Sequence, residues 1–369
     1  MARPAAFAPT FLLALAAASC QKPAAPAPTP TPTPERPAAA AAAPPAGPQT
    51  FAPSMPGKSD PECVGSLDFA PPETITSGGH TWKQDGYRLT LDVAPGTPVT
   101  LGVVANLNEP SPENLKAAEA YLAYFHEKGV QAIVVDGDSG ENAEAIEGTL
   151  TPFAKAGLPL LVDIGNRESK GGFLDAIEAL RKQFPNVFNL SKAREVDVGD
   201  VKILSLPGYH DPRYLLAGAD GCLYHTDDLR ALKTLATSLK GPIVLVSHGP
   251  PHGDGPHALD RVQSPPGNVG DPNLTTFLAE SRIPFGIFAN IIEAGGTATS
   301  LHGDRTIAPG TWSDELYLNP GAADTVPWSM NDGTQARGLV ATLSFKGGKA
   351  AYDLYRAGPT KASQPSAKR

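Results

Sequence analysis

The stretch that decides the fold is residues 243–253, which read I-V-L-V-S-H-G-P-P-H-G. Its first five residues are a short, largely apolar run, typical of a strand that is buried on both faces. Gly249, Pro250 and Pro251 end this strand, because proline continues neither a helix nor a central strand. His248 is therefore predicted to lie at the carboxyl end of a central strand, where open α/β folds bind their ligands.

Strand and helix patterns alternate on both sides of this stretch. Ser111 and Pro112 form a helix start, and Gly129 marks the end of that helix. The expected strands are 87–93, 99–105, 130–135, 158–164, a hairpin turned at 199–200, and 285–289; the expected helices are 112–128, 143–156, 173–184, 227–239 and 272–281. This order predicts a parallel α/β core with right-handed crossovers, and the late strands predict a second, mixed part of the sheet structure.

The amino-terminal 56 residues have the composition of an export segment and a tether. Residues 1–20 read as a signal peptide whose apolar stretch is too short to span a membrane. They end in A-A-S-C, which resembles a bacterial lipoprotein signal and implies cleavage before Cys20 and acylation there; the alternative is an ordinary signal peptide cut nearby. Residues 21–56 are mostly Ala, Pro and Thr, a composition that favours an extended tether.

The net charge limits the classes of molecule that the protein can bind, and the cysteine content bears on whether it contains a disulfide. The formal net charge of -8 and the lack of a basic stripe argue against binding to nucleic acid. If Cys20 is lipidated, Cys63 and Cys222 remain as an even pair in an oxidising compartment. They either form a disulfide that joins the segment after the tether to the loop 207–225, or remain two buried thiols.

Six polar clusters follow the predicted strands, and their order carries a resemblance to a known family. The clusters are A-N-L-N at 105–108, D-G-D at 136–138, G-N-R-E at 165–168, S-H-G-P-P at 247–251, A-N-I-I-E-A-G-G at 289–296 and L-N-P-G at 318–321. Over residues 97–355 this pattern resembles the calcineurin-like metallophosphoesterases. The resemblance implies an α/β fold, an αββα sandwich of two mixed sheets flanked by helices. We expect a β extension at 57–96, the phosphoesterase domain at 97–356 and a disordered tail at 357–369.

In that family the clusters hold two metal ions, and this sequence departs from the pattern at most ligand positions. Asp138, Asn166 and His248 match it. Amides or an aliphatic residue stand where the family has Asp or His at the other four positions, which are Asn106, Asn108, Asn290 and Ile292. Neutral amide oxygens are weaker ligands for transition metals than carboxylate and imidazole.

The replaced ligand positions are divided unevenly between the two expected metal sites. One site, with Asn106, Asn108, Asp138 and Ile292 as its ligand positions, is expected to be empty. The other, with Asp138, Asn166, His248 and Asn290, is expected to be poor. We therefore expect no metal or one weakly bound divalent ion as a cofactor, and not the dinuclear centre of the family.

Arg167 stands where the family has a histidine that assists at the leaving group. It could bind a phosphate-like anion as a catalytic residue, or form a salt bridge with Glu168, Asp138 or Asp163. Asp136 and Asp163 are expected to accept hydrogen bonds from turn amides rather than to bind metal.

Other histidines offer a rearranged site as an alternative. His252 and His257 follow His248 in the same loop, and His302 with Asp304 follows the cluster at 289–296. The competing interpretation is that each is a solvated loop histidine.

These observations predict an exported pseudo-phosphoesterase, anchored in the cell envelope through Cys20, that has a binding or structural role. Its expected partners are the membrane, through the lipid, and either a phosphate-like anion or an envelope protein. The alternative is an active single-metal phosphoesterase that hydrolyses phosphate monoesters or diesters with Asp138, His248 and Arg167.

Overall fold

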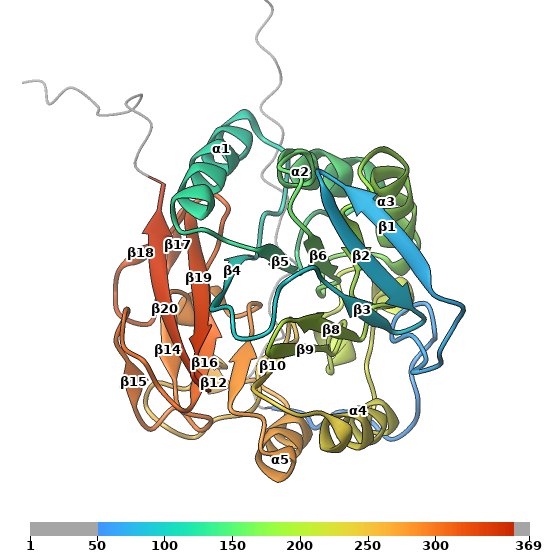
Figure 1. The fold of residues 1–369 in the computed structure, drawn as a ribbon. Coiled ribbons are helices and arrows are strands. Elements are labelled where there is room, and N and C mark those ends of the chain that lie inside the picture. Colours follow the sequence, from blue (N-terminus) through green and yellow to red (C-terminus); the bar gives the residue numbers. More distant parts are fainter. Residues whose placement is uncertain (1–50, 358–369) are drawn as a thin grey trace, which may run out of the picture. The chain divides into compact units, whose positions relative to one another are not determined.

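The computed structural model describes residues 51–357. The predicted signal peptide, Cys20, most of the predicted tether and residues 358–369 lie outside the described residues. The described part contains two large mixed sheets that face each other, with helices on their outer faces (Figure 1). Within residues 51–357, no helix is both long and apolar enough to cross a membrane.

The smaller sheet has six strands in the order β20-β19-β4-β5-β6-β7. Its strands are β4 (Val99–Val104), β5 (Ala132–Asp136), β6 (Leu160–Asp163), β7 (Val187–Asn189), β19 (Leu339–Lys346) and β20 (Lys349–Arg356). β4 to β7 are parallel, as the strand and helix order predicts, and β19 pairs antiparallel with both β4 and β20. The short strand β7 was not among the predicted strands.

The larger sheet has ten strands in the order β1-β2-β3-β8-β9-β10-β13-β16-β14-β15. Its strands are β1 (Glu73–Ser77), β2 (His80–Asp85), β3 (Arg88–Thr90), β8 (Glu195–Val198), β9 (Val201–Ser205), β10 (Ile243–Val246), β13 (Phe285–Ile287), β14 (Thr297–Thr299), β15 (Thr306–Ile307) and β16 (Leu316–Asn319). β9, β10, β13 and β16 form its parallel centre. β10 is therefore the buried central strand that the sequence predicts.

Within residues 51–357, five α-helices cover the outer faces of the sheets. They are α1 (Pro112–Glu127), α2 (Ala143–Lys155), α3 (Lys170–Gln183), α4 (Thr226–Ser238) and α5 (Pro272–Ser281). Their starts are fixed by side-chain caps, as where the Ser111 hydroxyl accepts a hydrogen bond from the Asn114 amide at 3.2 Å. Figure 1 shows α1, α2 and α3 at the top and α4 and α5 at the bottom, with the sheets between them.

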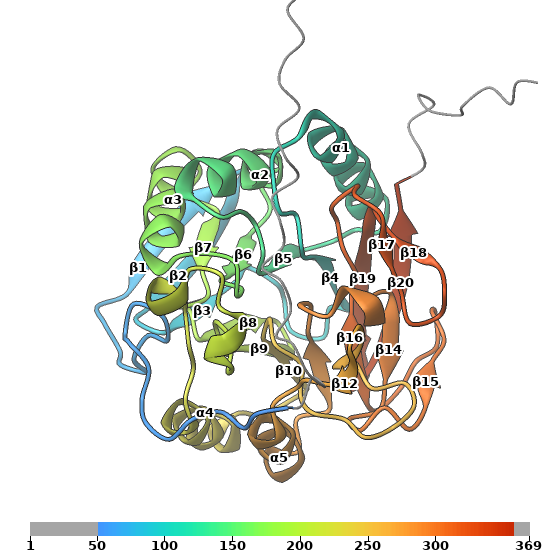
Figure 2. The ribbon, with the colours of Figure 1, turned by 180° about the vertical axis from the view of Figure 1, so that it is seen from behind.

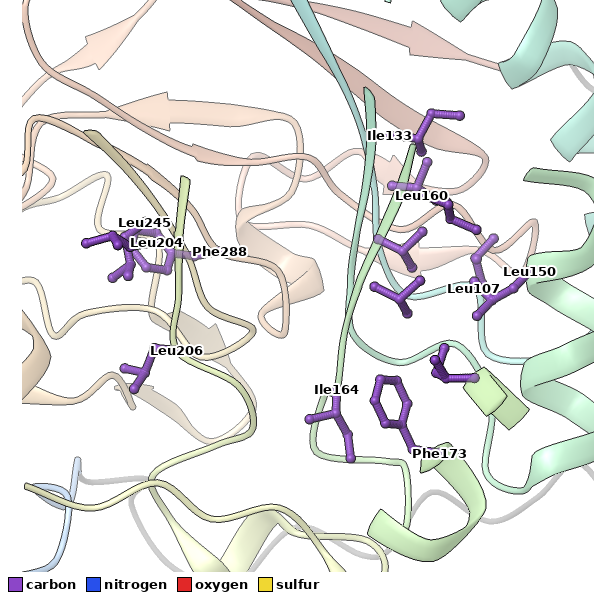
Figure 3. Packing of buried hydrophobic residues seen from close by; sticks show 14 of the residues in the cluster. Leu107, Ile133, Leu150, Leu160, Ile164, Phe173, Leu204, Leu206, Leu245 and Phe288 are labelled. Atoms are coloured by element: carbon purple, nitrogen blue, oxygen red, sulfur yellow. The ribbon is translucent and has the colours of Figure 1, made fainter. Parts of the chain in front are cut away.

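The core has an inner layer between the sheets and outer layers under the helices. Leu101 and Val134 of the smaller sheet belong to the same buried cluster as Val244 and Phe285 of the larger one. The alternate residues of these strands point outward and pack under the helices. Figure 3 shows this for Leu160 and its neighbours beside α2 and α3, and for Leu204, Leu245 and Phe288 in the other sheet. Figure 2 shows β5 and β6 above β9 and β10, so the ends of these strands approach one another across the layers.

Residues 51–96, which precede the predicted phosphoesterase domain, are bonded to the rest of the fold more extensively than the sequence indicated. The predicted β extension forms β1 to β3, and β3 pairs in parallel with β8, so the extension lengthens the larger sheet. The predicted tether boundary at Pro56 is wrong. Within residues 51–56, the Ser54 amide donates to Asp271 Oδ1 at 3.0 Å, and the Phe51 ring lies 4.2 Å from the His252 ring.

The predicted pairing of the two cysteines is present. Cys63 and Cys222 form a disulfide with their Cα atoms 5.2 Å apart. It joins the segment after residue 56 to the loop before α4, as expected. The segment between β10 and α5 contains the short hairpin of β11 (Arg261–Gln263) and β12 (Pro266–Asn268). Nearer the C-terminus, β17 (Trp328–Ser329) pairs with β18 (Gln335–Ala336).

Candidate functional site

Three of the predicted ligand residues meet where the ends of β5, β6 and β10 converge. His248 Nε2 lies 3.3 Å from Asp138 Oδ1 and 3.1 Å from Asn166 Oδ1. The Asn166 amide nitrogen donates to the Tyr214 carbonyl at 2.8 Å, which turns the amide oxygen toward His248. The prediction that these strand ends place their polar residues together thus agrees with the geometry.

The hydrogen bonds around His248 favour its doubly protonated form. Nδ1 donates to the main-chain carbonyl of Asp136 at 2.8 Å, while Nε2 faces two oxygen atoms. The ring is fully buried, which disfavours its charge, but the carboxylate of Asp138 outweighs burial and raises the pKa of His248 to about 10. Burial alone would raise the pKa of Asp138, whereas His248 holds it below its usual value. The two side chains therefore form a buried ion pair.

Two glycines allow this close approach. A Cβ atom on Gly137 would lie 2.4 Å from His248 Nδ1, and one on Gly165 would lie 2.6 Å from Asp138 Oδ1. Gly137 also has φ of 73°, a conformation that favours glycine. The glycines of the D-G-D and G-N-R-E clusters thus leave room for the ion pair.

The loop after β4 is held in a left-handed backbone conformation. Asn106 has φ of 52° and Asn108 has φ of 60°, and Asp138 beside them has φ of 55°. Asn and Asp tolerate this region better than other residues that have a side chain. The Asn108 amide donates to Asp324 Oδ2 at 2.9 Å, and the buried Asn106 Oδ1 has no hydrogen-bond partner in residues 51–357.

Three further acids are buried beside the ion pair. Asp136 and Asp163 are neighbours across β5 and β6, and neither is exposed. Asp163 Oδ1 accepts from the Ile164 amide at 3.0 Å, as expected of a turn residue, but neither carboxyl oxygen of Asp136 has a partner in the described chain. The expectation for Asp136 is therefore wrong. Glu168 accepts from the Ser139 and Gly165 amides at 2.5 and 3.0 Å.

Burial disfavours the ionised form of all three acids. It raises the pKa of Asp136 to about 7, against the attraction of His248. Burial, with repulsion from Asp138, raises the pKa of Glu168 to about 7, and burial with repulsion from Asp136 raises that of Asp163 well above its usual value. The His248 imidazolium, with the buried guanidinium of Arg194 that acts on Asp163, therefore neutralises only part of the acidic charge that four buried carboxyl groups can carry.

A pH dependence of stability follows from these shifts. Asp136 and Glu168 have pKa values of about 7 in the folded protein and about 4 in the unfolded chain. Between about pH 4 and pH 7 the folded state keeps protons that the unfolded state has lost, so these groups make the free energy of unfolding fall as pH rises. We expect Asp136→Asn to increase the free energy of unfolding at pH 7.5 by about 1–3 kcal/mol and to make it less dependent on pH.

Urea unfolding at pH 5 and pH 7.5 measures this effect, and the exposed Asp92→Asn serves as the control. If Asp136→Asn destabilises the protein at pH 7.5 by more than Asp92→Asn does, Asp136 is stabilising in its ionised form and our account of the acid cluster is wrong.

The remaining predicted positions do not converge on the His248 ring. Arg167 donates its main-chain N–H to Asp138 Oδ1 at 3.2 Å, while its guanidinium pairs with Glu141 at 2.6 Å. This partner is none of the three acids expected for a salt bridge. Asn290 donates its main-chain N–H to the His248 carbonyl at 3.0 Å, and Ile292 opens the short helix η3 (Ile292–Ala294).

The alternative of a rearranged histidine site has no support in the described chain. His252 pairs with the buried Asp260 at 3.0 Å, and His302 lies 3.7 Å from the exposed Asp254. His257 lines a separate cavity near the β11–β12 hairpin. The expected alternative of a plainly solvated residue is inaccurate for His252, which has both an acidic and an aromatic neighbour.

Sequence reasoning missed Asp324 and Tyr209. Asp324 follows β16 and accepts a hydrogen bond from Asn108, so it adds a carboxylate beside the loop after β4. Tyr209 is fully buried and packs so closely that a Cβ atom on Gly249 would lie 2.8 Å from its ring. The sequence offered only a weak signal for each: an acid three residues beyond N-P-G, and an aromatic residue in a Gly/Pro-rich loop.

The donor atoms at this site do not fit two divalent metal ions. Within residues 51–357, no three side chains of the His, Cys, Asp and Glu types are grouped to hold a metal ion. Asp138, Asn166 and His248 supply one carboxylate, one amide and one imidazole, and Asp324 adds a second carboxylate that is bonded to Asn108. Asn108 is engaged by Asp324, and the side chain of Ile292 has no ligand atom. Two adjacent divalent ions need more anionic and imidazole ligands than this set contains.

Comparison with known proteins gives structural likeness only. No protein-family model matches the sequence, and no match is found among curated proteins. One solved structure matches with a TM-score of 0.51 at 16% identity, covering 70% of this chain and 99% of the other. The protein TT1561 of Thermus thermophilus has a TM-score of 0.47 at 13% identity, covering 70% of this chain and 99% of that one. A dimetal phosphatase from Danio rerio has a TM-score of 0.43 at 10% identity, covering 70% and 96%.

The fold and these comparisons agree on the architecture. Two mixed sheets lie face to face with helices outside them, and the polar clusters lie at strand ends in the predicted order. The predicted fold class, an αββα sandwich of two mixed sheets flanked by helices, is confirmed.

Proposed function

We propose that this chain is a pseudo-phosphoesterase, a protein of phosphoesterase-type fold that works by binding rather than by dinuclear metal catalysis. The main support is the set of amide and aliphatic side chains at four of the family's ligand positions, which are Asn106, Asn108, Asn290 and Ile292. Neutral amides and a hydrocarbon are poor substitutes for the carboxylate and imidazole groups that hold two divalent ions.

The charge of the site also opposes phosphate binding. Asp136, Asp163 and Glu168 are buried beside the ion pair, and the guanidinium of Arg167 is paired with Glu141. A phosphate ester at this site would find both cations described above, the His248 imidazolium and the Arg167 guanidinium, already paired with acids. This favours an envelope protein over a phosphate-like anion as the partner.

The proposed location is the bacterial cell envelope, with the chain exported and anchored through Cys20. Support comes from the lipoprotein-like signal at residues 1–20 and the Ala/Pro-rich segment after it. The Cys63–Cys222 disulfide is consistent with folding in an oxidising compartment.

The alternative proposal is a single-metal phosphoesterase. The convergence of Asp138, Asn166 and His248 favours it, because three potential ligands already surround one point. Their chemistry, with one anion and one imidazole, makes a weak site for manganese, iron or zinc.

Metal content and turnover distinguish the two proposals. We expect the purified protein to contain less than about 0.1 equivalent of manganese, iron or zinc, and to hydrolyse neither aryl phosphate monoesters nor diesters. Restoring the family's ligands with Asn106→Asp, Asn108→His, Asn290→His and Ile292→His should raise metal content and turnover together. The matched control changes the same four residues to serine. Stoichiometric metal and turnover in the unaltered protein would establish the alternative.

A further inference from the structure

A second candidate site lies beside the β11–β12 hairpin. A cavity of about 730 Å³, open to solvent on one side, is bordered by this hairpin, η3 and the turn after β17. Asn331 ties the walls together, because its main-chain N–H donates to the Glu293 carbonyl at 2.7 Å and its side chain donates to the Arg261 carbonyl at 2.8 Å. Gln263 adds a hydrogen bond to the Met330 carbonyl at 2.5 Å. The cavity is therefore bounded by segments that are held to one another.

Three charged side chains line this cavity, Glu293, Asp332 and Arg261, and none of them forms an ion pair within residues 51–357. Glu293 is half-buried, and its carboxylate forms no ion pair with any residue in 51–357. The guanidinium of Arg261 donates to the Pro256 carbonyl at 3.1 Å and likewise has no acidic partner in the described chain. Burial raises the pKa of Glu293, and the hydrogen bond that its carboxylate accepts from Trp328 opposes this shift only in part. A ligand that brought both a cation and an anion would satisfy both groups.

The other residues that line the cavity indicate the chemistry of the part of the ligand between its two charged groups. Val262, Ala294 and Met330 present apolar surface, and threonine and amide side chains lie among them. The volume lies within the range of small-molecule sites, about 300–1,000 Å³, and exceeds what a single amino acid needs.

We propose that this cavity binds a short peptide with free termini, its ammonium group toward Glu293 and its carboxylate toward Arg261. The apolar side chains of the peptide pack against Val262, Ala294 and Met330. This inference does not rest on the proposed function, because it uses none of the residues around His248.

Isothermal titration calorimetry with trileucine tests the proposal, using the free peptide, its N-acetyl form, its C-terminal amide and the doubly blocked form. We expect the free peptide to bind, each single block to weaken binding at least tenfold, and the doubly blocked form to give no heat. Glu293→Gln should lose as much affinity as N-acetylation, and N-acetylation of the ligand should then cost nothing more. Arg261→Gln should lose as much affinity as C-terminal amidation, and amidation of the ligand should then cost nothing more.

The matched controls are the exposed Glu109→Gln and Arg230→Gln, which should leave binding unchanged. Circular dichroism of each variant verifies that it is folded. No heat with any form of trileucine, or equal affinity for the free and doubly blocked forms, would overturn the proposal. Loss of affinity in Glu293→Gln that does not depend on the blocked amino group would remove its role as the ammonium partner.

Discussion

Replacing His248 with alanine is expected to lower the free energy of unfolding by about 3–5 kcal/mol, the usual cost of breaking a buried ion pair. The imidazolium is fully buried and faces Asp138 and Asn166. Removing it leaves the Asp138 carboxylate without a cation, beside acids that already lack one. It also leaves the Asp136 carbonyl without its donor.

The direction in which the free energy of unfolding changes with pH is a second property by which this ion pair can be tested. His248 has a pKa of about 10 in the folded protein and about 6.5 in the unfolded chain. Its contribution is therefore fully present below about pH 6.5 and is lost as the pH rises through about 10. The difference in unfolding free energy between the unaltered protein and His248→Ala should shrink over that interval.

Urea unfolding in the presence of EDTA measures this effect without interference from metal ions. The exposed His126→Ala is the control and should change stability by less than about 0.5 kcal/mol. In an Asp138→Asn background the loss caused by His248→Ala should be smaller, since the partner charge is already gone. If His248→Ala is neutral or stabilising in EDTA, His248 does not stabilise the fold through Asp138, and our account of the ion pair is wrong.

Local signals in the sequence were sufficient to predict most of the fold. The Ser111 cap and Pro112 start α1 at the predicted residue, and the Pro272 helix also has its predicted bounds. β7 was missed because three residues after a helix carry too little periodicity to be recognised. The end of the tether was misplaced because Phe51 and Ser54 are stabilised by contacts with His252 and Asp271, which are more than 200 positions away.

The candidate site, like the fold, was predictable from the sequence only in part. Asp138, Asn166 and His248 each follow a predicted strand, so their convergence could be inferred from sheet topology alone. The pairing of Arg167 with Glu141 and of Asn108 with Asp324 depends on loop conformation, which the pattern does not encode. The unpartnered carboxyl of Asp136 is also a tertiary property, because its burial comes from layers on both sides of β5.

Loss of the disulfide is expected to have the other large effect, a decrease of about 5 kcal/mol in the free energy of unfolding. Cys63 and Cys222 are separated by 159 positions, so their bond restricts a long loop of the unfolded chain. In the chain-entropy view, a longer loop gives greater stabilisation of the folded state. The loop spans β1 to β9 and so contains Asp138 and Asn166, whereas His248 lies outside it.

The double variant Cys63→Ser, Cys222→Ser and the reduced wild type should lose stability alike in urea unfolding, and added reductant should not affect the double variant further. The folded structure should change little, since both residues are buried and the neighbouring Tyr209 amide bonds to the Cys222 carbonyl, not to its sulfur. The His248–Asp138 contact should therefore persist in the reduced protein, and His248→Ala should cost the same there as in the oxidised one. If reduction leaves the unfolding midpoint unchanged, the bond contributes no net stability. If it abolishes the effect of His248→Ala, the disulfide acts on the site in the folded state, and the entropic explanation fails.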